Sequence, residues 1–220
     1  MRPLRVIFFD VRNTLLFPNR PKMLAPLARE LWPSLENWQA LERRTKKEFD
    51  EHMANGGVDH GFWWMFHTHL LEEMGESPSL REALVRNMQN SAYWDHIVPG
   101  TRAVLDRIAR QFRIAVISNA DGGVANVLSR CGIGDCFEAV TDSGNVGVEK
   151  PRKEIFDLAL RTMNASPAGS LYVGDVYSVD YVGARNAGMD AVLLDVAGAY
   201  SDRDLPRVQS LEQLENWLQP

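Results

Sequence analysis

The chain has 220 residues, of which 45% are hydrophobic and 24% are charged, and its net charge is −5 at pH 7. This balance predicts a folded protein with one good core and room for a second small one, and it argues against wholesale disorder. The basic residues form no stripe, so we expect no nucleic-acid partner. The densest basic cluster, residues 41–49, also holds Glu42 and Glu48 and is interpreted as a solvated helix face.

The sequence also bears on the cellular location of the protein and on whether its cysteines bind zinc or form a disulfide. The N-terminal apolar run is too short for a signal peptide or a membrane span, so we expect a cytoplasmic protein with no membrane partner. Cys131 and Cys136 lack metal-ligand spacing and a His-rich partner segment, so neither a zinc site nor a disulfide is expected. The oligomeric state stays open.

The first predicted strand carries an acid at its end. Residues 6–9 are all apolar and are followed by Asp10, the turn-forming Asn13 and Thr14. A buried strand that ends on a carboxylate lies where an open α/β sheet places its ligands. Alone, this pattern does not distinguish a turn or capping Asp from a catalytic one.

Residues 17–93 have a helical pattern. A proline-containing loop is followed, from about Lys22 to Tyr93, by apolar residues at spacings of three and four. The first expected helix in this part covers Met23 to Trp32, and Ser34 and Ser77 are expected to begin later helices. We predict an all-helical insertion between the first strand and the next.

The predicted insertion is rich in aromatic, histidine and arginine residues. We expect its larger aromatic residues mainly to pack the helices, although one ring facing a crevice would favour an apolar or aromatic leaving group. These residues are Trp32, Trp38, Trp63, Trp64, Phe62 and Phe66. His67 and His69 lie two apart and point to different faces, so with His60 they are interpreted as solvated or locally hydrogen-bonded. Arg43 and Arg44 are interpreted as part of a polar helix face.

From residue 94 onward, strands and helices alternate. Apolar runs predict strands at 113–119, 137–143, 170–175 and 190–196. Amphipathic segments predict helices at 98–112, 121–133, 150–163, 178–189 and 210–218. The alternation implies parallel strands with helices on both faces. The predicted fold is therefore α/β, a doubly wound parallel sheet built from residues 1–16 and 94–220, with a helical cap at 17–93.

Polar side chains gather where these strands end. The residues at the strand tips are Asp10, Ser118, Asn119 and Asp175. Right-handed crossovers bring the tips to one edge of the sheet, and Lys150 and Asp180 lie at helix entrances beside them. Three converging acids need a cation, and a few oxygen ligands suit Mg²⁺. This set is the one that phosphoryl transfer to a carboxylate nucleophile requires.

The motifs resemble those of the haloacid dehalogenase (HAD) superfamily of hydrolases. Four segments match in order: FFDVRNTL with Asp10 and Thr14, AVISN with Ser118, EKPRKEIF with Lys150, and GDVYSVD with Asp175 and Asp180. The resemblance covers nearly the whole chain, including a cap between the first two motifs. It implies catalytic roles for Asp10, Thr14, Ser118 and Lys150, and Mg²⁺ ligation by Asp10, Asp175 and Asp180. We expect Ser118, Asn119 and Lys150 to bind a small phosphorylated substrate.

One position departs from the superfamily's phosphatases, because Arg12 stands where they carry a second Asp. In those enzymes that Asp is the general acid and base, a role that Arg performs poorly because its pKa lies above about 12. The resemblance implies that the backbone carbonyl of Arg12 still binds the metal. Its side chain has three open roles: neutralising a leaving group, clamping an anionic substrate, or forming a salt bridge to Asp175 or Asp180.

Three functions follow from these observations. The first is a Mg²⁺-dependent phosphatase that is weakened by Arg12, or restricted to leaving groups that need no proton. The second is a dehalogenase in which Asp10 attacks carbon. The superfamily's dehalogenases also lack the second Asp, but they do not need the acid that Asp175 supplies. The third is a binding or regulatory module with impaired catalysis. The identity of the substrate stays open.

Overall fold

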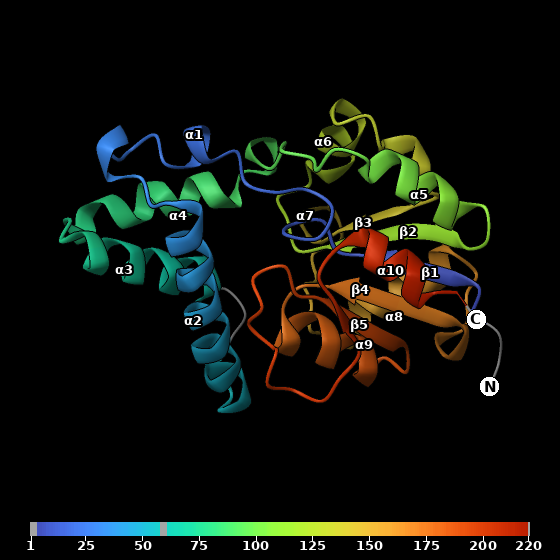
Figure 1. The fold of residues 1–220 in the computed structure, drawn as a ribbon. Coiled ribbons are helices and arrows are strands. Elements are labelled where there is room, and N and C mark those ends of the chain that lie inside the picture. Colours follow the sequence, from blue (N-terminus) through green and yellow to red (C-terminus); the bar gives the residue numbers. More distant parts are fainter. Residues whose placement is uncertain (1–3, 58–60, 220) are drawn as a thin grey trace.

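The computed structural model describes residues 4–57 and 61–219. Within these ranges the chain forms one parallel sheet with the strand order β3-β2-β1-β4-β5-β6 (Figure 1). The strands are β1 Val6–Phe9, β2 Arg113–Ser118, β3 Val140–Asp142, β4 Ser170–Gly174, β5 Asp190–Leu194 and β6 Arg207–Val208. The predicted doubly wound α/β fold is confirmed.

Strand β1 lies in the middle of the sheet, and all four of its residues are buried. Val6 and Phe8 pack in one apolar cluster, whereas Ile7 and Phe9 pack in another. Successive side chains of a strand point to opposite faces, so an entirely apolar strand belongs in a sheet covered on both sides. One face is covered by α8 Lys153–Thr162 and α9 Val182–Asn186. The other is covered by α5 Thr101–Ala109, α6 Val124–Arg130 and α10 Leu211–Trp217.

A helical insertion separates β1 from β2 and stands to one side of the sheet (Figure 1). Its helices are α1 Arg20–Met23, α2 Leu35–Ala54, α3 Phe62–Met74 and α4 Arg81–Gln89. Ser34 begins α2 as predicted, because its hydroxyl accepts a hydrogen bond from the Asn37 amide at 3.1 Å. Trp38 packs against Phe66 with their ring centroids 4.8 Å apart, so aromatic rings join α2 to α3. The exact limits of a cap at 17–93 stay a prediction.

Several local predictions are wrong. The expected helix from Met23 to Trp32 is instead a turn followed by a short 3₁₀ segment, Arg29–Leu31. Pro26 lacks an amide hydrogen and disfavours helical geometry in the residue before it, which explains the break. Strand β3 is shorter than predicted. Helix α7 Ser143–Val146 and strand β6 were not predicted, since elements of four and two residues carry no readable periodicity.

His67 and His69 are buried in α3 rather than solvated. Nδ1 of His67 lies 2.7 Å from the Trp63 carbonyl oxygen. His69 contacts the Thr45 hydroxyl at 3.3 Å and the Glu48 carboxylate at 3.0 Å. The prediction of local hydrogen bonding is therefore confirmed for His67, whereas the partners of His69 lie on α2. Solvation is wrong for both residues. His60 lies outside the described residues.

Two further observations concern the membrane and the cysteines. In the described part of the chain, no helix combines the length and the apolar character that a membrane crossing requires. Cys131 and Cys136 are both free thiols.

Burial of His67 should make stability depend on pH. Burial lowers the pKa of His67 to about 4, whereas an unfolded histidine titrates near about 6.5. The unfolded state therefore binds more protons between these values, and stability should fall as the pH drops through this window. The loss should reach about 3 kcal/mol.

The measurement is urea unfolding of wild type and His67→Gln from pH 7.5 to pH 4. Between these limits the wild type should lose about 3 kcal/mol more stability than the variant. The carboxylates titrate in both proteins and cancel in the comparison. Parallel stability curves would show that His67 is protonated without penalty in the folded state.

Candidate active site

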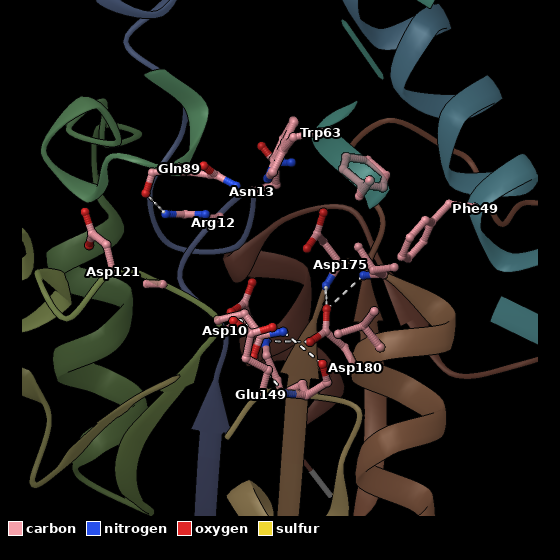
Figure 2. A pocket seen from close by; sticks show the side chains of 16 residues that line it. Asp10, Arg12, Asn13, Phe49, Trp63, Gln89, Asp121, Glu149, Asp175 and Asp180 are labelled. Carbon is pink, nitrogen blue, oxygen red and sulfur yellow. Dashed lines mark hydrogen bonds and ion pairs between the residues drawn. The ribbon is translucent and has the colours of Figure 1, made fainter. Parts of the chain in front are cut away.

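A cavity of about 340 Å³ opens between the carboxyl edge of the sheet and the helical insertion (Figure 2). From the core it is lined by Asp10, Arg12, Asn13, Asn119, Ala120, Asp121, Glu149, Lys150, Asp175, Val176, Val179 and Asp180. From the insertion it is lined by Phe49, Phe62, Trp63 and Gln89. The structure thus brings together most of the predicted site residues and adds an apolar wall contributed by the insertion.

Neighbouring strands deliver the first two acids. Asp10 follows β1 directly, Asp175 follows β4, and these strands pair in parallel with Phe9 opposite Val173. Together with Asp180, they place one oxygen each within 4.8 Å of one another, and all three side chains are buried. The predicted convergence of the three acids is confirmed.

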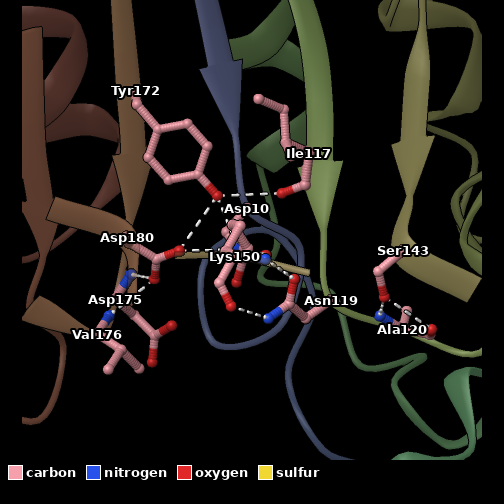
Figure 3. A network of polar contacts seen from close by, with 10 residues as sticks. All are labelled: Asp10, Ile117, Asn119, Ala120, Ser143, Lys150, Tyr172, Asp175, Val176 and Asp180. Atoms are coloured by element: carbon pink, nitrogen blue, oxygen red, sulfur yellow. Dashed lines mark hydrogen bonds and ion pairs between the residues drawn. The ribbon is translucent and has the colours of Figure 1, made fainter. Parts of the chain in front are cut away.

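Lys150 lies at the centre of a buried polar network (Figure 3). Its Nζ donates to Asp10 Oδ1 and Asp180 Oδ1, each at 2.7 Å, and to the Tyr172 hydroxyl at 2.8 Å. Tyr172 in turn donates to the Ile117 carbonyl at 3.0 Å. Two carboxylates raise the pKa of Lys150, although burial opposes this shift, so the ammonium is charged.

Tyr172 was missed by the sequence analysis because an aromatic residue inside an apolar strand is usually core. A signal was present nonetheless. A tyrosine fully buried in the middle of a parallel strand needs a partner for its hydroxyl, and that partner had to come from a neighbouring strand or its loop. Tyr172 supplies an oxygen that helps to hold the Lys150 ammonium.

Asp180 holds the loop that carries Asp175. Its Oδ2 accepts hydrogen bonds from the amides of Asp175 and Val176 at 3.0 and 2.9 Å, while Oδ1 accepts from Lys150. The Asp180 side chain can lie this close to the backbone of β4 because residue 174 is glycine. A Cβ there would lie 2.7 Å from both Cβ and Oδ2 of Asp180. Both oxygens of Asp180 are therefore engaged in positioning its neighbours.

Asn119 holds the backbone of Lys150 rather than its side chain. Its Oδ1 accepts from the Lys150 amide at 2.8 Å, and its Nδ2 donates to the Lys150 carbonyl at 2.9 Å. Ser118 Oγ and Thr14 Oγ1 are buried and have no hydrogen-bond partner among the described residues. Neither residue lines the cavity. Buried hydroxyls without partners are uncommon and call for an explanation.

A second lysine reaches the site from the insertion. Lys46, on α2, is 1% exposed, and its Nζ lies 2.8 Å from Asp175 Oδ2 and 2.8 Å from Glu42 Oε1. The interpretation of residues 41–49 as a solvated face is wrong for Lys46 and Glu42, which are both buried. A signal was present, because Trp38, Leu41 and Phe49 mark a helix face that also includes positions 42, 45 and 46.

Arg12 points toward the insertion rather than the acids (Figure 2). Its Nη2 donates to the Gln89 carbonyl at 2.7 Å, and its guanidinium lies 5.4 Å from the ring centroid of Trp94. Gln89 is the last residue of α4, so the cation sits where a helix end favours positive charge. Within the described ranges Arg12 forms no ion pair with Asp175 or Asp180, so that alternative is wrong.

Burial shapes the charge of the acids. It raises the pKa of Asp10, and the ammonium of Lys150 opposes the shift. Burial likewise raises the pKa of Asp175 to about 7, against the effect of Lys46. Carboxylates at this depth need a cation to stay charged, and a compact set of oxygen donors fits Mg²⁺. Asp10 and Asp175 line the cavity and are the residues that could hold it.

The aromatic residues of the insertion divide into two groups. Trp63 lines the cavity with Phe49 and Phe62, whose centroids lie 5.5 Å apart. Trp64 is 42% exposed and lies under the guanidinium of Arg81 at 3.8 Å. Of these two tryptophans, only Trp63 faces the site. Arg43 and Arg44 are not among the lining residues and contact the Ala197 carbonyl and Glu73 instead.

Comparison with known proteins agrees with this geometry. A sequence model of the haloacid dehalogenase-like hydrolases matches residues 4–188, which is most of the chain. The chain belongs to this family. The HAD-like hydrolase resembles haloacid dehalogenase-like hydrolase domain-containing protein 3 of Xenopus laevis, at 29% identity over 87% of this chain and 84% of that protein.

Two other similarities bear on the chemistry and the fold. The glyceraldehyde 3-phosphate phosphatase of Pyrococcus furiosus is 30% identical to the HAD-like hydrolase over 93% of this chain and 86% of that protein. Among solved structures, the putative HAD-hydrolase YfnB of Bacillus subtilis, determined bound to magnesium, covers 100% of both chains. It does so with a TM-score of 0.71 and 21% identity, which shows a shared fold.

Substitution of Gly174 should test how Asp180 is held. In Gly174→Ala the new methyl group would overlap the Asp180 side chain, so Asp180 must move away from Lys150 and the Asp175 amide. We expect a loss of about 1–3 kcal/mol in the free energy of unfolding. The matched control is Gly61→Ala, where, among the described residues, an added Cβ would meet only the Phe49 ring at 3.9 Å. Equal losses in the two variants would contradict this account of Asp180.

Proposed function

We propose that this HAD-like hydrolase is a Mg²⁺-dependent phosphatase that acts on a small phosphorylated metabolite through an aspartyl-phosphate at Asp10. The observation that carries the proposal is the buried cluster of Asp10, Asp175 and Asp180, with Lys150 bonded beneath an open cavity. The phosphatase name of the Pyrococcus relative supports the reaction class. A cytoplasmic location stays a prediction.

The residues that would hold Mg²⁺ are Asp10 and Asp175, with Asp180 positioning Asp175. The family resemblance adds the backbone carbonyl of Arg12. When bound, the ion would neutralise the converging acids and polarise the phosphoryl group. The fit rests on the donor set, which consists of oxygens only and is small enough to leave positions for water and substrate.

The core residues supply the phosphoryl transfer. The Asp10 carboxylate would attack phosphorus in line, so that an O–P bond forms while the bond to the leaving group breaks. Lys150 keeps Asp10 ionised and oriented through the bond to Oδ1. Thr14 and Ser118 have buried hydroxyls without a partner among the described residues, and these donors would engage a phosphoryl group only after a rearrangement of their loops, since neither residue lines the cavity. Water then releases phosphate from Asp10.

The insertion supplies the surroundings of the leaving group. Phe49, Phe62 and Trp63 form an apolar wall that excludes water, while Arg12 and Gln89 form a polar side of the cavity. Arg12 is a poor general acid for an alkoxide leaving group and a poor base toward water, because the pKa of a guanidinium lies far from neutral pH. The site therefore favours leaving groups that depart as stable anions, such as acyl or aryl phosphates, and an aryl group would pack against the apolar wall.

A dehalogenase, in which Asp10 attacks carbon, is the second candidate, and the observation that favours it is Arg12. Against it stands the way Asp180 fixes the Asp175 loop, since attack on carbon needs no metal and hence no acid at Asp175. A binding module with impaired turnover is the third candidate. A phosphatase mechanism gives a role to more of the buried charged side chains than either alternative does.

A substrate screen tests the proposal. Acetyl phosphate, aryl phosphates, alkyl phosphates and 2-haloacids should be assayed with Mg²⁺ and with excess chelator, using wild type and the nearly isosteric Asp10→Asn. We expect acyl and aryl phosphates to be hydrolysed only with Mg²⁺ and only by the wild type. Turnover of 2-haloacids in chelator would establish the dehalogenase instead.

Arg12→Asp should restore the missing proton transfer. General acid-base catalysis typically contributes about 10²–10⁴ in rate, so kcat for an alkyl phosphate should rise by about 10²-fold. Arg12→Asn is the matched control, because it removes the same positive charge without adding a titratable group. A fall in kcat for Arg12→Asp, with brisk wild-type turnover, would show that Arg12 itself binds substrate or stabilises the leaving group.

A further inference from the structure

Lys46 is a buried cation that the catalytic scheme does not use. It projects from the middle of α2 in the insertion, yet its ammonium lies 2.8 Å from Asp175, at the carboxyl end of β4. Its second partner, Glu42, lies one helical turn earlier at 2.8 Å. The insertion thus carries a fixed positive charge to a predicted metal ligand.

The Asp175 carboxylate therefore has two competing cationic partners, the Lys46 ammonium and the proposed metal ion. Asp175 must offer an oxygen to a divalent cation, while its Oδ2 already accepts from the Lys46 ammonium. A bound ammonium draws electron density from the carboxylate and repels a second cation nearby. The repulsion acts in a buried site, where solvent screens it little. A stronger ion pair between Lys46 and Asp175 therefore lowers the affinity of Asp175 for a metal ion.

We infer that Lys46 is a positioning residue that sets the Mg²⁺ affinity of the site, by holding Asp175 from the insertion in competition with the metal. The inference rests on the proposed function, because it takes Asp175 as a Mg²⁺ ligand. Binding linkage is reciprocal, so Mg²⁺ also weakens the contact between Lys46 and Asp175 and thereby the attachment of α2 to the sheet edge. Metal occupancy and the attachment of the insertion to the sheet edge are coupled through one ion pair.

Neighbouring contacts show that this ion pair belongs to a larger attachment. Asp50, also on α2, accepts a hydrogen bond from the Ser178 amide at 3.0 Å, in the short π-helical segment Tyr177–Tyr181 that follows Asp175. Lys47 pairs with Asp202 at 3.0 Å on the surface, where its side chain is 53% exposed. Lys46 differs from these contacts because it touches a proposed metal ligand itself.

The chain offers a matched set of variants for calorimetric titration with Mg²⁺. At a pH high enough to keep Asp175 ionised in both proteins, Lys46→Met removes the competing ammonium and should tighten Mg²⁺ binding at least about fivefold, the lower end of typical site coupling. Lys47→Met removes the same charge from the next residue of α2 and should leave the affinity unchanged. The double variant Glu42→Gln/Lys46→Met removes one charge of each sign and should still bind more tightly than wild type. Glu42→Gln alone should weaken Mg²⁺ binding, because Lys46 then has Asp175 as its single acidic partner among these two and holds it more strongly.

The outcomes separate this inference from the proposed function. No measurable Mg²⁺ binding by wild type or by any variant would refute the metal site itself. Binding by wild type that Asp175→Asn abolishes, with equal affinities in wild type and Lys46→Met, would refute only the role of Lys46. Weaker binding in Lys46→Met would likewise overturn it and make Lys46 a purely structural support. Should Lys46→Met fail to fold, Glu42→Gln decides alone, and tighter or unchanged binding there would contradict the inference.

Discussion

The ammonium of Lys150, bonded at 2.7 Å to both Asp10 and Asp180, is the interaction on which the rest of the site depends. Buried charges are costly, and a buried cluster loses about 3–5 kcal/mol when one partner is removed. Asn119 fixes the Lys150 backbone from the end of β2, and Tyr172 supports its ammonium from β4. Because β1 lies between β2 and β4, the strand order brings all of these groups to one point.

A second ion pair joins the acid cluster to the insertion. Lys150 belongs to the core and holds Asp10 and Asp180, whereas Lys46 belongs to the insertion and holds Asp175. Three buried acids thus meet cations from two parts of the chain that are more than 100 residues apart in sequence. Arg12, which the sequence places closest to Asp10, instead binds the end of α4. The site therefore joins the insertion to the sheet through charge as well as through apolar packing.

Much of this arrangement could be predicted from the sequence. An apolar run ending in Asp10 predicts a buried strand with an acid at its tip, and the later strand ends add Ser118 and Asp175 by the same rule. Local patterns do not reveal which helix face meets the sheet edge. Lys46 and Glu42 therefore looked like surface charges, although tertiary contact buries both of them. Pro26 outweighed the apolar spacing around it, and the direction of the Arg12 side chain depended on the position of α4.

The central claim is that Asp10 becomes phosphorylated, and mass analysis of an acid-quenched reaction tests it most directly. The enzyme should be mixed with Mg²⁺ and an aryl phosphate, stopped within the first turnover and digested. The account predicts the mass of one phosphoryl group on the peptide that contains Asp10, and none in Asp10→Asn. An unmodified peptide during rapid turnover, or an ester of Asp10 formed from a 2-haloacid without Mg²⁺, would contradict it.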